Sequence, residues 1–482
     1  MALSSTRALF AVLACGLCAA CATGAALRST PTQDHAALRS APTQDQAAVQ
    51  PDPSPDQDEA HKSYIFPVVE IVAMDAALNF AGRLLLDPAT FEVSRETIRH
   101  NLRGPWVVDD DPFQVNQFLH PYQGAMYHSI ARSNGLSYWS SMVYTFAGSA
   151  MWEIAGETTQ PSANDQIASG IAGSFLGEPL FRISRLLLER GGDRPGAWRR
   201  LASVLASPPT GINDALVGDP AGSPTSDALP FSDIRVQLGT SAVVNGRVGS
   251  VSSLTLNQPQ LALSMDYGYP GHASYRHERP FDYFRIDSSV SNDGLEQLST
   301  RGLIAGTNYG SDRLAGIWGL YGTYDYFAPD DFRFSTTAFS FGTTLQGSIS
   351  EPLVVQSSGL VGVGYTASHG REEAAGDYHY GVTPHTLVNL RLIAGRRAAL
   401  DMTAREYFVS GLGGFGLSQR DLIFLGDASL AVRIYGRHAL ALTYQLAGRS
   451  SEYLELPDQT QSRSRVGVFY TFLGSGGFGA VQ

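Results

Sequence analysis

Cysteine is nearly absent from this 482-residue sequence, and clustered basic charge is scarce. The three cysteines, Cys15, Cys18 and Cys21, all lie within the first 21 residues. The rest of the chain can therefore form neither a disulfide framework nor a thiolate metal site. The formal net charge of −11 argues against nucleic-acid binding, which needs Lys and Arg clusters to neutralise phosphates.

Glycine and aromatic residues, by contrast, are abundant. The chain has 50 glycines, and 10% of its residues are aromatic. Together they favour β-strands joined by tight turns over a helical bundle. A length of 482 residues predicts two or more structural units.

The N-terminus has the pattern of an export signal, which we assign to residues 1–21. Arg7 supplies a positive charge, and Ala8 to Ala20 is an apolar stretch too short to span a membrane. The ending at Cys21 resembles a bacterial lipoprotein signal, which would place lipid on that cysteine. Cleavage after Ala20 or Ala22 by ordinary signal peptidase is the alternative.

Three further segments have the composition of linkers or tails. Residues 22–62 are rich in Pro, Gln, Asp, Ala and Ser and contain a near-repeat, so they cannot bury enough apolar area to offset chain entropy. We predict a disordered tether there. Residues 217–231 form a second linker, and residues 475–482 form a C-terminal tail.

Residues 63–216 are predicted to form a mainly α-helical domain, because their apolar residues recur at three- and four-residue spacing. Leu136 to Trp152 carries no charge and indicates a buried or membrane-adjacent helix. Another helix should begin near Pro161, with Ser162 or Asn164 as its cap, and run to about Pro179. Its small residues should lie on one face and let another backbone approach closely. These residues are Gly170, Gly173 and Gly177.

From residue 232 to 474 the hydrophobic period changes to two. Leu440, Leu442 and Tyr444, for example, alternate with smaller or polar residues. About twelve such segments predict an all-β transmembrane antiparallel barrel of the outer-membrane type. Alternating short and long connections place the start of the barrel and the C-terminus on the periplasmic side. The rival interpretation is a soluble β-sandwich or soluble barrel.

Two features of this region bear on its surfaces. Tyr321, Tyr324, Tyr326 and Phe327 cluster near a strand end, as in an interfacial aromatic girdle. Five arginines fall in the polar register and should face the lumen: Arg235, Arg285, Arg391, Arg405 and Arg433. A wide lumen lined in this way would favour anions, whereas a plugged lumen would pair these arginines with the acidic helical domain.

Trp106 to Leu188 contains several polar motifs in close succession. They are Asn116 to Gly124 with its His-Pro-Tyr, Trp152-Glu153, Asn164-Asp165 and Gly177-Glu178-Pro179. This combination resembles a bacterial family called domain of unknown function 3943, found in predicted outer-membrane proteins. The resemblance implies a location and an architecture, and no activity.

The same stretch holds residues that could carry chemistry. Glu153 and Glu157 are four residues apart, and on one helix face they would repel unless a cation or a raised pKa compensated. With His120, His128 and Asp165 they are the candidate catalytic residues, through zinc binding or general acid/base work on a lipid or envelope polymer. No established catalytic spacing is present, and whether a metal binds is left open.

The alternative for these polar groups is a structural network that pins the helices together. Its members would be Asn116, Arg132, Asn164, Glu178 and Arg182. The basic cluster Arg194, Arg199 and Arg200 beside Trp198 has two readings, a contact with anionic lipid headgroups or a solvated helix face.

The sequence thus predicts an outer-membrane barrel of structural or transport type, with the helical domain on the periplasmic side or within the barrel. The alternative is an outer-membrane enzyme with a His/Glu/Asp site in that domain. The expected partners are outer-membrane lipid and the barrel-assembly and export machinery. We expect no cofactor and no nucleic acid.

Overall fold

A computed structural model describes residues 62–109, 111–192, 195–217, 231–247, 250–271, 275–311, 313–329, 332–370, 378–411, 419–453 and 457–480. The predicted signal peptide with Cys21, nearly all of the first tether and most of the second linker lie outside these residues.

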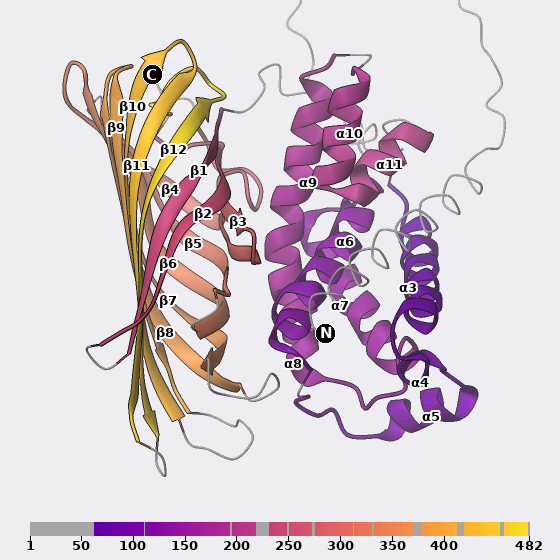
Figure 1. Ribbon diagram of the computed structural model, residues 1–482. Coiled ribbons are helices and arrows are strands. Elements are labelled where there is room, and N and C mark those ends of the chain that lie inside the picture. Colours follow the sequence, from indigo (N-terminus) through magenta and orange to yellow (C-terminus); the bar gives the residue numbers. More distant parts are fainter. Residues whose placement is uncertain are drawn as a thin grey trace, which may run out of the picture. The chain divides into compact units, whose positions relative to one another are not determined.

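The chain divides into two compact units, drawn in Figure 1. The helical unit takes residues up to Val107, Gln123–Gly170 and Leu180–Asp227. The barrel unit takes Val108–Tyr122, Ile171–Pro179 and the chain from Ala228 onward. Two short segments of the helical region therefore belong with the barrel.

The helical region contains the predicted helices. Their bounds are α3 Phe66–Leu85, α4 Pro88–Phe91, α5 Arg95–Arg103, the π-helix η1 Val115–Leu119, α6 His120–Ser133, α7 Tyr138–Ala155, α8 Ala163–Ile167, the π-helix η2 Ala168–Ala172, α9 Gly173–Glu189, α10 Ala197–Ala206 and α11 Pro208–Val217. The predicted cap is confirmed, since the Ser162 hydroxyl accepts a hydrogen bond from the Asp165 backbone N–H at 3.2 Å. Among the described helices, none combines the length and apolarity needed to cross a membrane.

Twelve strands form one closed antiparallel barrel, in which β1 pairs with both β2 and β12. Their bounds are β1 Ser232–Arg247, β2 Ser250–Tyr267, β3 Phe284–Ser291, β4 Gly294–Ser311, β5 Leu314–Phe327, β6 Phe332–Ser350, β7 Leu353–Gly370, β8 His379–Ala394, β9 Ala398–Val409, β10 Gln419–Tyr435, β11 His438–Tyr453 and β12 Gln459–Leu473. Closure leaves no free sheet edge and rules out the sandwich. The predicted fold class and strand number are confirmed.

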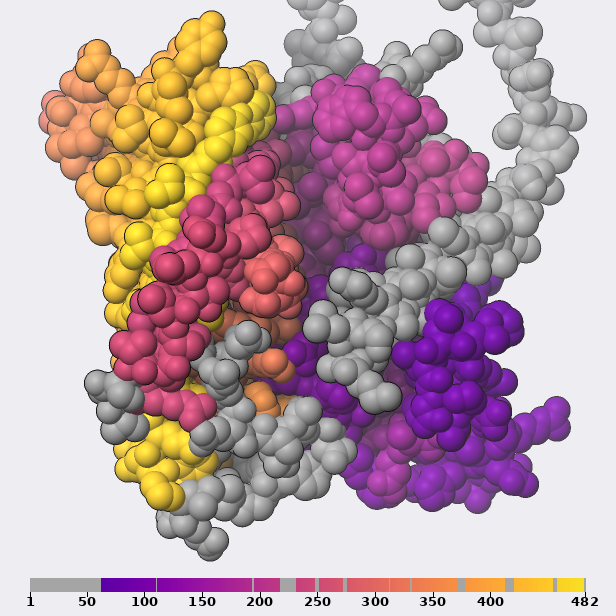
Figure 2. Space-filling view, in the orientation of Figure 1, coloured from indigo at the N-terminus to yellow at the C-terminus, as the bar shows by residue number. Residues whose placement is uncertain are grey.

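The outward register of the barrel is apolar, as the alternation predicts. Leu440, Leu442, Val466 and Val468 are each about half exposed, while the residues between them point inward. Figure 2 shows part of this surface, where the yellow C-terminal strands lie beside β1. A wall with apolar side chains outside and polar ones inside is the pattern of a membrane barrel.

The connections differ between the two ends of the barrel. At one end, which we call the hairpin end, residues 312–313, 351–352, 395–397 and 436–437 join consecutive strands directly. At the other, the loop end, β7–β8 and β9–β10 are joined by longer segments that lie largely outside the described residues. The predicted alternation fails before β4, because the long connection 268–283 joins β2 to β3 at the hairpin end.

One of the two extra segments of the barrel unit packs on the outer wall near the loop end. Tyr324 lies in the outward register, since its neighbours Thr323 and Asp325 line the interior. Its hydroxyl donates to the Gln117 carbonyl at 2.6 Å, and the Gln117 amide donates to the Tyr380 hydroxyl at 3.0 Å. This part of the wall is therefore covered by protein.

The predicted aromatic girdle is wrong for this reason. Tyr324 and Tyr326 point outward but are buried, and the Tyr326 ring packs against Phe118 with centroids 5.5 Å apart. Tyr321 and Phe327 have the opposite register and belong to apolar clusters inside the barrel. The sequence showed that these aromatic residues lie near a strand end, but it did not show which side of the wall they face.

The second extra segment explains how a helix continues through Pro179. The prediction that this helix ends near Pro179 is wrong, because α9 runs to Glu189. Proline has no N–H to donate to the carbonyl four residues earlier, which is that of Phe175. The Thr300 hydroxyl of β4 supplies the missing donor at 3.3 Å. The Phe175 ring lies against Gly322 of β5, where an added Cβ would stand 2.7 Å from the ring.

Candidate functional site

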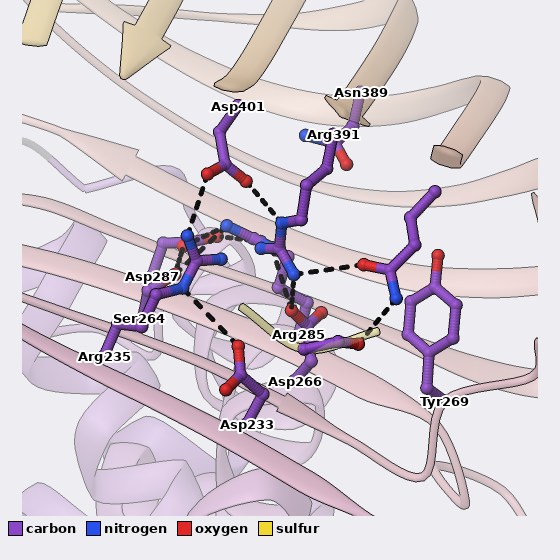
Figure 3. Close-up of polar contacts among 12 residues, drawn as sticks. Asp233, Arg235, Ser264, Asp266, Tyr269, Arg285, Asp287, Asn389, Arg391 and Asp401 are labelled. Atoms are coloured by element: carbon purple, nitrogen blue, oxygen red, sulfur yellow. Dashed lines mark hydrogen bonds and ion pairs between the residues drawn. The ribbon is translucent and has the colours of Figure 1, made fainter. Parts of the chain in front are cut away.

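A layer of arginines and aspartates crosses the interior of the barrel (Figure 3). Asp401 of β9 accepts hydrogen bonds from two of these arginines. Arg235 Nη1 of β1 lies 2.8 Å from Asp401 Oδ2, and Arg391 Nε of β8 lies 2.5 Å from Asp401 Oδ1. Three strands separate β1 from β9 in the barrel. The Arg235–Asp401 pair therefore spans the lumen.

Further contacts tie β2 and β3 into the same layer. Asp266 of β2 is 3.2 Å from Arg391 and 3.0 Å from Arg285 of β3. Arg285 also pairs with Asp287 at 2.8 Å. We call this set the charge layer: Asp233, Arg235, Asp266, Arg285, Asp287, Arg391 and Asp401. Buried charges of this kind are stable only when each has a partner.

Other polar contacts cross the lumen toward the loop end. Arg405 of β9 pairs with Asp325 of β5 at 3.2 Å, and the Tyr407 hydroxyl donates to the same carboxylate at 3.0 Å. Arg465 of β12 pairs with Glu296 of β4 at 2.5 Å. Each of these pairs joins strands with three others between them, so several layers of side chains fill the interior.

Apolar clusters occupy both ends of the lumen. At the loop end, Phe327, Phe332 and Phe334 pack with Tyr407 and other inward residues. At the hairpin end, the chain after β12 turns back so that Phe478 is 1% exposed among small inward residues. The Gly479 carbonyl there accepts from the Gln356 amide at 2.7 Å, and the Ser475 hydroxyl donates to Asp233 at 2.6 Å.

The five arginines predicted for the lumen occupy the inward register. Arg433, at the hairpin end, lies over the Phe478 ring at 5.7 Å. For the other four, the ion-pair partners are carboxylates of the barrel strands, so the expected pairing with the acidic helical domain is wrong. The sequence did contain a pattern that indicates these carboxylate partners. Asp233, Asp266 and Asp287 stand at alternate positions in the same register as the arginines.

Glu153 and Glu157 do not share a helix face, and this prediction is wrong. Helix α7 ends at Ala155 and Gly156 follows as its cap, so Glu157 lies beyond the helix. The Glu157 carboxylate accepts from the Trp152 indole N–H at 2.8 Å. The Glu153 carboxylate accepts from the Ser162 backbone N–H at 2.8 Å. Glu153 therefore does not face Glu157, but a carboxylate oxygen of Asp165 lies within 4.8 Å of its own carboxylate.

The remaining catalytic candidates are distributed over both units. His120 begins α6 and belongs to the barrel unit. His128 is buried in the helical unit, with its ring edge-on to Tyr138 at 5.3 Å. Asp165 accepts from the Asn164 amide at 3.2 Å, and Asn164 accepts from the Ser162 hydroxyl at 2.8 Å. The catalytic role of these residues stays a prediction.

The residues predicted for a structural network are also distributed. Asn116 is buried in the barrel unit and donates to Asp109 at 2.6 Å and to the Tyr378 hydroxyl at 2.7 Å. Arg132, in the helical unit, donates to the Leu136 carbonyl and lies over the Phe181 ring at 4.7 Å. Glu178 belongs to the barrel unit and Arg182 to the helical unit.

Of the three glycines predicted to share a helix face, Gly170 packs closely against an aromatic ring. An added Cβ at Gly170 would stand 2.3 Å from the Phe146 ring. The close approach of two backbones occurs at Gly124, where an added Cβ would stand 2.0 Å from the Ser169 carbonyl. Gly173 and Gly177 lie in the first turns of α9, within the barrel unit.

Helix α10 carries the predicted basic cluster and an exposed apolar face. Trp198, Leu201 and Leu205 are all exposed and recur at helical spacing. The Arg199 guanidinium lies over the Trp198 ring at 5.0 Å, and Arg194 lies outside the described residues. Exposed aromatic and aliphatic side chains beside arginine are typical of helices at a lipid interface. The lipid contact stays a prediction.

A buried carboxyl in the helical unit makes its stability depend on pH. Asp75 of α3 accepts from the Tyr127 hydroxyl at 2.5 Å, and its other oxygen has no hydrogen-bond partner among the described residues. Burial raises the pKa of Asp75 well above its usual range, and the Tyr127 hydrogen bond opposes this only in part. The folded helical unit therefore holds this carboxyl in its protonated form more readily than the unfolded chain does.

We predict that the helical unit loses stability as pH rises from about 4, where an unfolded Asp ionises, through the raised folded pKa of Asp75. Asp75→Asn should reduce this dependence, because the amide cannot ionise. Denaturant unfolding of the full chain, followed by helical circular dichroism at several pH values, tests it. Exposed Glu92→Gln is the control. Equal slopes for Asp75→Asn and wild type would contradict the assignment.

Residues 105–209 match the family model described as Domain of unknown function (DUF3943), which confirms the resemblance seen in the sequence. No curated protein matches the chain.

Several solved structures match about half of this chain. The Pseudomonas putida toluene transporter TodX is 8% identical, over 50% of this chain and 89% of that one, with a TM-score of 0.20. Pseudomonas aeruginosa OpdQ is 10% identical, over 50% and 98%, with a TM-score of 0.20. OmpT, an outer membrane protein of Vibrio cholerae, is 7% identical, over 51% and 97%, with a TM-score of 0.19. What TodX transports is a property of TodX alone.

Proposed function

We propose that this protein is an outer-membrane β-barrel with a closed lumen, which acts as a structural element of the envelope rather than as an open pore. The observation that carries the proposal is the charge layer, in which Asp401 of β9 bonds to Arg235 of β1 and to Arg391 of β8. The placement of the helical domain stays a prediction.

The outer surface supports a membrane location. A barrel that exposes Leu, Val and Phe on most of its outward register would aggregate in water, whereas lipid satisfies the same side chains. The closed sheet also leaves no unpaired backbone group along its wall. Lipid is accordingly the partner that the described surface fits.

The side chains inside the barrel support a closed lumen. A barrel of twelve strands is wider than one of eight, whose lumen ordinary side chains fill, so long side chains are needed to cross it. Arginine is the longest available, and here Arg235, Arg391 and Arg405 each reach a carboxylate on a distant strand. Phe478 at the hairpin end and the Phe327 cluster at the loop end add apolar layers.

We predict that the purified full chain, reconstituted in planar bilayers, shows no stepwise conductance, although it migrates as a heat-modifiable barrel in gels. The double variant Arg391→Ala/Asp401→Ala should conduct. It removes a central pair while Arg235 keeps Asp233 at 3.5 Å and Arg285 keeps Asp266 and Asp287.

The matched control is Glu351→Ala/Arg396→Ala, which removes one charge of each sign from exposed turns at the hairpin end. It should stay silent. Steady conductance from the wild type would refute a closed lumen. A silent double variant would show that the charge layer is not the barrier.

A further inference from the structure

Helix α3 has the reverse of the usual distribution of polar and apolar side chains. On the surface of a soluble protein, a helix turns its charged residues to water and its apolar residues to the core. In α3 the acidic residues Glu70 and Asp75 are buried, whereas Val68, Val72 and Phe80 are between 46% and 63% exposed. The helix therefore turns carboxylates inward and apolar side chains outward.

Helix α7 repeats this distribution. Its buried stripe consists of polar residues at four-residue spacing, namely Ser141, Thr145, Ser149 and Glu153. Glu153 is the one charged residue of the helix. On the outside, Trp139 is 53% exposed and Val143 is 66% exposed. Small and hydroxyl-bearing residues at helix contacts, with apolar residues outside, are typical of helices that pack in lipid.

The buried carboxylates are held by hydrogen bonds from within the helical unit. Glu70 Oε2 accepts from the Asn134 amide at 3.0 Å and from the Asn213 amide at 3.2 Å. Glu153 accepts from the Ser162 backbone N–H at 2.8 Å. Rotating either helix to bring its carboxylates to water would break these bonds, so the inverted orientation is fixed by the interior.

The two outer faces lie on adjacent helices. An added Cβ at Gly148 of α7 would stand 3.1 Å from the Ile71 side chain of α3. The Tyr144 hydroxyl donates to the Tyr64 carbonyl at 2.6 Å, and the Asn79 amide donates to the Gly156 carbonyl at 2.8 Å. These contacts follow both helices along their length. We call the exposed residues of the pair the apolar face: Val68, Val72, Phe80, Trp139 and Val143.

Helix α5 of the same unit has a surface of the ordinary kind. It exposes charged residues, which are Arg95, Glu96, Arg99 and Arg103. Its Asn101 is buried and donates to the Glu153 carbonyl at 3.4 Å, so α5 packs on the end of α7 with its polar surface outward. The helical unit therefore combines a surface suited to water with an apolar face that is not.

We propose that the apolar face contacts the hydrocarbon of the bilayer in which the barrel lies. A protein partner would form about one hydrogen bond per 100–200 Å² of interface. The exposed positions of α3 between Tyr64 and Gly82 hold only tyrosine, isoleucine, valine, alanine and phenylalanine, so this face has almost no group for such bonds. Lipid chains require none.

The connection between the units keeps the helical unit near that bilayer. The chain passes from one unit to the other after Val107, Tyr122, Gly170 and Pro179. None of the described helices is long and apolar enough to cross a membrane, so the proposed contact is along one side of α3 and α7. The inference rests on the membrane location of the barrel and is independent of whether the lumen is closed.

Quenching by brominated lipid tests the contact, because bromine on the acyl chains quenches tryptophans that lie close to them. The full chain is reconstituted in vesicles of dioleoylphosphatidylcholine, with or without bromine on the chains. Val143→Trp should raise the fraction of fluorescence that is quenched, and Trp139→Phe should lower it. Arg99→Trp, on the charged surface of α5, is the matched control and should add fluorescence that bromine does not quench.

The proposal is overturned if the tryptophans of Val143→Trp and Arg99→Trp respond equally to bromine. It is also overturned if light scattering in micelles shows a dimer that Val143→Arg converts to a monomer, because a second copy would then cover the apolar face. Trp318 lies in the outward register of β5 and is 50% exposed. If Trp318→Phe lowers the quenched fraction while Val143→Trp does not raise it, the barrel lies in lipid and this inference alone fails.

Discussion

Asp401→Ala should lower the free energy of unfolding by about 3–5 kcal/mol, the usual cost of removing one partner from a buried ion pair. The carboxylate of Asp401 accepts from Arg235 at 2.8 Å and from Arg391 at 2.5 Å, and its side chain is 14% exposed. Its loss takes one of two carboxylate partners from each arginine, since Arg235 keeps Asp233 and Arg391 keeps Asp266. Guanidinium unfolding of the full chain in detergent micelles, followed by tryptophan fluorescence, measures the effect.

Two variants separate charge from shape. Asp401→Asn keeps the size and removes the charge, so it should lose most of the same stability. Arg391→Ala/Asp401→Ala should be less destabilised than the sum of its single variants, because the two residues pair directly with each other and each single variant already removes that contact. If Asp401→Ala costs less than about 1 kcal/mol, the pair is as weak as an exposed one, and the interior is open to water.

The barrel could be predicted from the sequence because its wall has a strict physical period. Lipid requires apolar side chains at every second position, and Leu440, Leu442, Val466 and Val468 follow that rule. The five lumenal arginines are part of the same pattern. The pattern assigns each residue to one side of the wall, but it does not say which residue stands across the lumen.

The predictions that proved wrong depend on contacts between residues that are far apart in the sequence. Arg391 finds Asp266 only because β8 and β2 curve around the same lumen. Tyr324 is covered because the segment around Gln117 lies on that patch of the wall. Helix α9 continues through Pro179 because Thr300 replaces the missing donor. None of these partners is near its counterpart in the sequence, so no local pattern predicts the pairing.

The catalytic candidates in the helical domain also could not be placed from sequence spacing alone. The spacing of Glu153 and Glu157 indicated a shared helix face, but the helix ends at Ala155. Gly156 is the C-cap of α7, so Glu157 lies beyond the last turn of the helix. The charge layer matches no known sequence motif. The alternation pattern predicted that its arginines face the lumen, but it did not predict their partners.

Phe478→Ala should also lower the free energy of unfolding by about 3–5 kcal/mol, because it empties a fully enclosed site. The residues around Phe478 include Ala399, Ala431 and Ala439, whose small side chains leave room for the ring. These alanines come from strands already paired on both sides, so they cannot move inward to fill the space. The same micelle unfolding experiment measures the loss.

Phe472→Ala is the matched control, since Phe472 lies only six residues away but points outward and is 36% exposed. It removes the same number of atoms from the lipid-facing surface and should cost much less. Phe478→Ala should remain silent in planar bilayers, because the charge layer still spans the lumen. Conductance from Phe478→Ala alone would show that the turned-back chain is the main barrier, and equal costs for the two phenylalanines would show that Phe478 is not packed inside.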